Sequence, residues 1–144
     1  MDDHEQIAAI LTRYEQAVLD RDVDAVFADY IPNPVAYDLA PPLETRGAAV
    51  LDREGLKTWL DSWDGPVRVT SQEPAILVDG DLGILFTLQH MTGTKKGEGE
   101  TDLWFRCTVA LRRIAGAWKI VHIHTSVPMA MDGSGKAETG LKPA

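Results

Sequence analysis

Hydrophobic residues recur at helical spacing in the first part of this chain and alternate with polar residues in its second half. A first helix is predicted from one apolar stripe, formed by Ile7, Ile10, Leu11, Tyr14 and Val18. A shorter helix is predicted over residues 22–30, where Asp22 can cap its start and Pro32 stops it. Asp52 can cap a third helix whose apolar side is Leu56, Trp59, Leu60 and Trp63.

The remaining pattern is typical of strands. Residues 32–42 hold four prolines, so only a short strand at residues 35–38 fits there. Beyond Gly65-Pro66, alternation and turn residues predict a meander with strands at 67–73, 75–78, 83–92, 101–114 and 117–127. Helices followed by strands indicate an α+β fold.

The last two predicted strands collect unusual side chains on single faces. Strict alternation places Asp102, Trp104, Arg106 and Thr108 on one face of the first, and Leu103, Phe105, Cys107, Val109 and Leu111 on the other. On the second strand it groups Trp118, Ile120, His122, His124 and Ser126. Such faces suggest the wall of a pocket with polar ends, although Trp104 and Arg106 also fit a cation–π pair on the outer sheet face.

Composition narrows the classes of function. The 144 residues, of which 44% are hydrophobic, fit one domain over residues 1–128 with an extended tail over 129–144. A net charge of -8 argues against nucleic acid as a partner. No signal peptide or membrane span is recognisable, so a cytoplasmic protein without membrane contact is expected. The single cysteine, Cys107, is predicted to be a packed thiol.

The segment from Gly116 to Pro128, with its Trp-x-Ile-Val-His-x-His-x-Ser core, carries a family resemblance. It resembles the last strand of SnoaL-like and ketosteroid-isomerase-like proteins of the NTF2-like superfamily, and of the association domain of calcium/calmodulin-dependent protein kinases. The resemblance extends over residues 5–128. It implies a cone in which three N-terminal helices pack on a curved, mostly antiparallel sheet, with a ligand site in the open end.

That cone predicts the residues of the site. The residues expected to line it are Tyr14, Asp38, Trp59, Trp63, His90, Trp104, Arg106, His122 and His124. Resemblance to ketosteroid isomerases implies that Asp38 moves a proton on carbon and that Tyr14 donates a hydrogen bond to the developing oxyanion. The second acid of those enzymes is missing, since its place falls near Ala110. An exposed loop carboxylate remains the alternative for Asp38, and a core residue the alternative for Tyr14.

The His122 and His124 pair leaves three interpretations open, which are proton transfer or hydrogen bonding to a substrate, metal binding, and a structural role. A metal would need His90 or Asp38 as a third ligand, and the resemblance implies a metal-free site. Neither a metal nor a cofactor is therefore expected.

Two functions follow as hypotheses. The first is a protein that binds a small, largely apolar ligand with a polar end and isomerises, dehydrates or hydrates it, with Asp38 as base, His124 or His90 as acid, and Arg106 binding the polar end. The second is a ligand-sensing or association module without chemistry. An epoxide hydrolase, suggested by Asp102 and Arg106, lacks the close Arg-x-Asp spacing of that family. Apolar sheet surface left uncovered by the helices predicts a homodimer.

Overall fold

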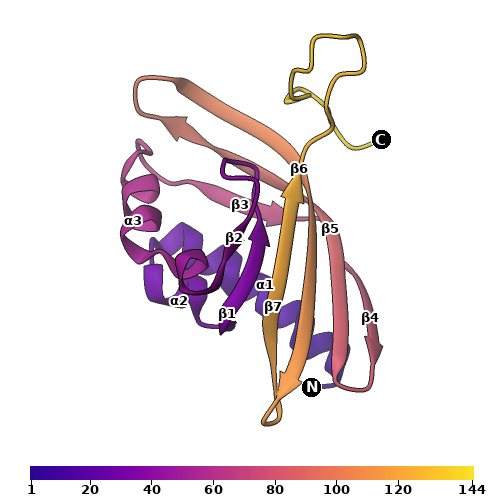
Figure 1. The fold of residues 1–144 in the computed structure, drawn as a ribbon. Helices are drawn as coiled ribbons and strands as arrows, with labels where there is room; N and C mark the ends of the chain where they lie inside the picture. The colour runs from indigo at the N-terminus through magenta and orange to yellow at the C-terminus, as the bar shows by residue number, and fades with distance from the viewer.

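The computed structural model describes all 144 residues, which form helices packed on one face of a seven-stranded sheet (Figure 1). The helices are α1 (Asp3–Asp20), α2 (Val23–Phe27), the short 3-10 helix η1 (Gly47–Leu51) and α3 (Arg53–Asp61). The strands are β1 (Tyr30–Tyr37), β2 (Thr45–Arg46), β3 (Arg68–Ser71), β4 (Ala75–Asp79), β5 (Leu82–Lys95), β6 (Gly99–Ile114) and β7 (Ala117–Ser126). The predicted α+β cone is confirmed. No helix is both long and apolar enough to span a membrane.

Acidic side chains start all three α-helices. The backbone N–H of Ala25 donates to Asp22 over 3.1 Å, and that of Gly55 donates to Asp52 over 3.0 Å, as the sequence predicts. At α1, Asp2 and Glu5 accept hydrogen bonds from each other's backbone N–H groups. The expected extent of the second helix is wrong, because α2 ends at Phe27 and the chain already enters β1 at Tyr30.

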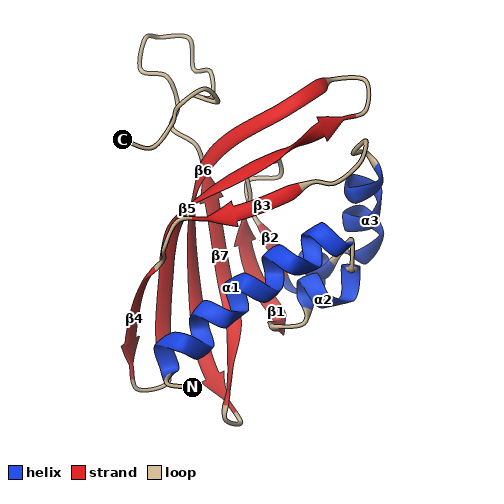
Figure 2. Ribbon diagram, turned by 180° about the vertical axis from the view of Figure 1, so that it is seen from behind, coloured by secondary structure: helices blue, strands red, loops and turns tan.

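The sheet runs in the order β2-β1-β7-β6-β5-β3, with β4 also paired to β5. Only the β1–β7 pair is parallel. α1 lies across the sheet, and we call the face that it covers the inner face and the opposite one the outer face (Figure 2). On β6 the odd-numbered residues from Phe105 to Leu111 are buried, whereas Arg106 and Thr108 are exposed. The inner face therefore carries the odd-numbered side chains of β6.

An irregularity in β7 changes which side chains reach the inner face. Ala110 of β6 pairs with His122, but the next residue, Leu111, pairs with Ile120, so Val121 is an extra residue in the ladder. Trp118 and Ile120 are buried under α1. The expectation that His122 and His124 share their face is wrong, because the extra residue moves both histidines to the outer face.

Two hydrophobic clusters fill the space between the helices and the sheet. The first lies under the N-terminal half of α1 and includes Ile7, Leu111 and Trp118. The second lies under its C-terminal half and includes Val18, Leu60 and Trp63. Such burial is the main source of stability for a domain of this size. The candidate site lies beside the first cluster.

The residues after β7 leave the sheet and turn back on themselves (Figure 1). Ala130 donates its backbone N–H to Lys136 over 2.7 Å, which closes a loop in place of the predicted extended tail. Lys142 returns to the outer face of the sheet, where its ammonium group lies 3.1 Å from Asp102.

Candidate functional site

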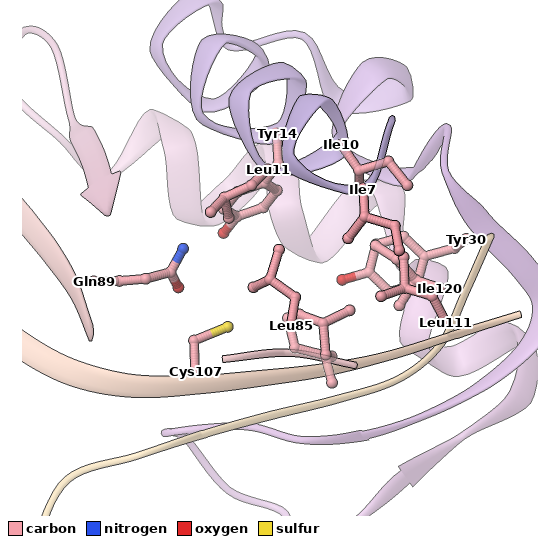
Figure 3. Close-up of a pocket in the computed structure, with 12 residues that line it drawn as sticks. Ile7, Ile10, Leu11, Tyr14, Tyr30, Leu85, Gln89, Cys107, Leu111 and Ile120 are labelled. Carbon is pink, nitrogen blue, oxygen red and sulfur yellow. The ribbon is translucent and has the colours of Figure 1, made fainter. Parts of the chain in front are cut away.

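A small cavity lies between α1 and the inner face of β5, β6 and β7 (Figure 3). Its twelve lining residues are Ile7, Ile10, Leu11, Tyr14, Tyr30, Leu85, Gln89, Cys107, Val109, Leu111, Ile120 and Ile123. Its volume is about 30 Å³, whereas an engineered apolar cavity that holds benzene measures about 150 Å³. The cavity has room for the tip of a ligand and not for a ring.

Two tyrosines bring hydroxyl groups into this apolar environment (Figure 3). Tyr14 comes from α1 and Tyr30 from the start of β1. Burial raises the pKa of both hydroxyls above the ordinary value, and the nearby charge of Asp38 adds to that effect. Both groups therefore stay protonated at neutral pH and can donate a hydrogen bond to an oxygen atom that develops negative charge.

Asp38 follows directly after β1. Asp38 is exposed in the loop after β1, as the alternative interpretation predicted, yet the protein around its carboxyl group raises its pKa through desolvation. A carboxylate with a raised pKa is a better base near neutral pH than an ordinary one. The charge of Asp38 also contributes to the raised pKa of Tyr14.

Asp38 also lines a much larger groove at the surface, whose volume is about 610 Å³. Its lining residues are Tyr37, Asp38, Leu39, Leu43, Glu44, His124, Thr125, Ser126 and Val127. This volume falls within the range of about 300–1,000 Å³ that small-molecule sites occupy. The groove brings together two predicted site residues, Asp38 and His124, from segments far apart in the sequence.

The two histidines of β7 pack around Tyr37 on the outer face. Ring centroids of Tyr37 lie 4.6 Å from His122 and 5.5 Å from His124, each in an edge-on arrangement. His122 Nδ1 lies 2.7 Å from the carbonyl oxygen of Val35, an acceptor, so this nitrogen carries the proton. His122 is thereby held by the sheet and does not line the cavity, which corrects the prediction. His124 reaches the groove only.

Three other predicted lining residues, His90, Trp104 and Arg106, lie on the outer face, so the prediction that they line the cone is wrong. His90 stacks on Trp104 with ring centroids 4.3 Å apart, and its Nε2 lies 2.6 Å from Asp102. Arg106 donates from Nε to the hydroxyl of Ser126 over 3.1 Å. Strand alternation explains the placement, since their inward-facing neighbours are Gln89, Phe105 and Cys107.

Trp59 and Trp63 do not line the cavity or the groove either, which corrects their predicted place in the ligand site. They meet edge to face, with centroids 5.5 Å apart, in the second hydrophobic cluster. Lys95, from the long β5–β6 hairpin, places its ammonium group over both rings. These tryptophans hold α3 against the hairpin.

Cys107 lines the cavity, and burial raises its pKa to about 12. A thiol with such a pKa is uncharged at neutral pH and therefore a poor nucleophile. The structure contains no cluster of three or more His, Cys, Asp or Glu side chains that could hold a metal ion. The hydroxyl groups around the cavity and the carboxyl and imidazole groups around the groove can act through hydrogen bonds and proton transfer.

Sequence reasoning missed Tyr30 and Gln89. The sequence predicts Tyr30 at the end of a helix because Pro32 is typical of a helix stop, yet β1 begins at Tyr30 and runs through Pro32 and Pro34. Gln89 stands at an inward position of β5 among apolar residues, and a polar residue in such a position signals a site.

Comparisons with known proteins agree with this architecture. A family model described as the SnoaL-like domain matches residues 7–130. An NTF2-like protein of unknown function from Pseudomonas putida KT2440 is 27% identical, with a TM-score of 0.83 and 99% of each chain covered. An NTF2-like superfamily protein from Salmonella enterica serovar Typhimurium LT2 is 20% identical, with a TM-score of 0.75, covering 92% of this chain and 96% of that one.

A ketosteroid isomerase-like protein from Erwinia carotovora atroseptica SCRI1043 is 22% identical, with a TM-score of 0.70, covering 88% of this chain and 97% of that one. No match was found among curated proteins. At these identities the likeness to the last two structures concerns the fold, whereas the family model extends over most of the chain. The chain therefore belongs to the SnoaL-like domain family of the NTF2-like superfamily.

Proposed function

We propose that this protein binds a small, largely apolar ligand with a carbonyl or hydroxyl group and catalyses its isomerisation, dehydration or hydration by general acid–base chemistry. The observation that carries the proposal is the raised pKa of Asp38 beside the buried hydroxyls of Tyr14 and Tyr30. Asp38 would remove a proton from carbon next to a carbonyl group, while Tyr14 and Tyr30 would donate hydrogen bonds to the oxygen that becomes negative.

The two spaces differ in what they can hold. Only the groove of about 610 Å³ has room for the body of the ligand, whereas the cavity of about 30 Å³, which shares no lining residue with the groove, has room for one small polar group. In the groove, His124 is the nearest candidate for the acid that returns the proton, since it lines the same space as Asp38. The outer-face position of Arg106 argues against the predicted role of this residue in binding the polar end.

The proposal can be tested with 2-tetralone, an enolisable ketone, dissolved in D2O. We expect the wild-type protein to accelerate deuterium uptake at the carbon next to the carbonyl group, and Asp38→Asn to lower that rate by about 100-fold or more. Glu44→Gln is the matched control. Glu44 lines the same groove, but unlike Asp38 it does not contribute to the raised pKa values of Tyr14 and Tyr30. Equal rates for Asp38→Asn and the wild type, with both folded, would contradict the proposal.

The alternative of an association module without chemistry has one observation in its favour, which is exposed apolar surface on β4 and β5. Leu77, Ile84 and Phe86 are 61%, 42% and 45% exposed on a sheet face that no helix covers. Such surface fits a second copy of the chain, and we propose a homodimer through this face whichever function holds.

A further inference from the structure

Gln89 is the only fully buried polar side chain in the core, with 3% of its surface exposed. It extends from the inner face of β5 toward the cavity, opposite Tyr14 (Figure 3). Its Nε2 donates to the hydroxyl oxygen of Ser71 on the neighbouring strand β3 over 3.2 Å. A buried carboxamide is costly unless its hydrogen bonds are made, so this position is built for a polar contact.

The hydrogen bond to Ser71 fixes which end of the carboxamide faces the cavity. Nε2 is the donating end, and it is engaged with the hydroxyl oxygen of Ser71. The oxygen Oε1 of Gln89 is then left as an acceptor for whatever enters the cavity.

We propose that Gln89, oriented by Ser71, determines the specificity of this site, and that the inner end of the ligand carries a hydroxyl group that donates to Gln89 Oε1. This inference rests on the proposed ligand-binding function and narrows its substrate class to carbonyl compounds that also carry a hydroxyl group. Tyr14 and Tyr30 donate hydrogen bonds, so they accept both hydroxyl compounds and ethers. Gln89 distinguishes between these two classes.

The test uses two fluorescent probes of nearly equal shape, 2-naphthol and 2-methoxynaphthalene, which differ in one hydrogen-bond donor. We expect the wild-type protein to bind 2-naphthol more tightly, and Gln89→Met to reduce that preference about five- to tenfold, as expected for the loss of one hydrogen bond. Asp38 is unchanged in both proteins, so its contribution to the preference cancels. Gln72→Met, which replaces the exposed glutamine next to Ser71, should keep the wild-type preference.

Ser71→Ala provides a second variant that leaves Gln89 in place but frees its carboxamide to rotate. We expect a smaller loss of preference, about two- to threefold, so this variant carries the test should Gln89→Met fail to fold. An unchanged ratio of the two dissociation constants in both variants would overturn the inference while the ligand site stands. Failure of both probes to bind the wild-type protein would overturn the site together with the inference.

Discussion

At the scale of single residues, burial changes the chemistry of groups that the sequence presents as ordinary. Desolvation raises the pKa values of Asp38, Tyr14 and Glu15, and the consequence differs with what each group contacts. The family resemblance pointed to Asp38 and Tyr14 as site residues. Glu15 could not be found in this way, because it stands beside the apolar stripe of α1 and the burial of its carboxyl group comes from tertiary packing.

Glu15 should cost stability at neutral pH. Its Oε1 is buried without a hydrogen-bond partner, and its pKa is raised in the folded state. The charged form is therefore disfavoured by folding, so the cost is present above the folded pKa and disappears as the pH falls below the unfolded value. We expect Glu15→Gln to raise the free energy of unfolding at pH 7 by about 1 kcal/mol.

Calorimetry at pH 7 and at pH 4 would check this expectation. The gain from Glu15→Gln should shrink at the lower pH, while Glu73→Gln, a change of an exposed residue, should have little effect at either pH. A loss of stability in Glu15→Gln at pH 7 would show that the carboxylate is favourably bound.

At the scale of elements, helices were more predictable than the faces of strands. The apolar stripes of α1 and α3 and the aspartate caps of α2 and α3 are local signals, and the structure agrees with them. The face that a strand residue occupies depends on its partner strand, and one extra residue at Val121 reversed the assignment of both histidines. Ile120 and Val121 are two successive apolar residues, which interrupt the alternation of apolar and polar side chains and indicate an extra residue at this point.

Deletion of Val121 tests the importance of that extra residue. Its neighbours Ile120 and His122 pair with the adjacent residues Leu111 and Ala110, so removal of Val121 leaves a regular ladder in which Ile123 stays inward and both histidines stay outward. We expect the deletion to lower the free energy of unfolding by no more than about 1–2 kcal/mol, measured by urea denaturation, because no side chain changes face. Val121→Ala is the control and should cost about 1 kcal/mol. A loss of about 3 kcal/mol or more in the deletion variant alone would show that the fold depends on the bulge itself.

At the scale of the whole molecule, the outer face of the sheet remains apolar where β4 and β5 pair. Leu77 pairs with Ile84, and Phe86 follows on the same face of β5. The sequence predicted an apolar face in need of cover, although it did not locate the patch on these strands.

Sedimentation velocity at about 20 μM should show a dimer, because a second copy of the chain would cover this exposed apolar surface. The centre of such an interface tolerates charge poorly. Phe86→Lys should produce a monomer that unfolds at nearly the wild-type temperature, since Phe86 is 45% exposed within one chain. A monomeric wild type would contradict the proposed assembly.

The central claim is that Asp38 acts as a base next to the buried tyrosine hydroxyls. Its most direct test is the pH dependence of deuterium uptake by 2-tetralone in the wild type and in Asp38→Asn. Because the pKa of Asp38 is raised, we predict that the wild-type rate falls as the pH drops through a value above 3.8, and that Asp38→Asn lacks this fall. A fall of equal size and midpoint in both proteins would contradict the account.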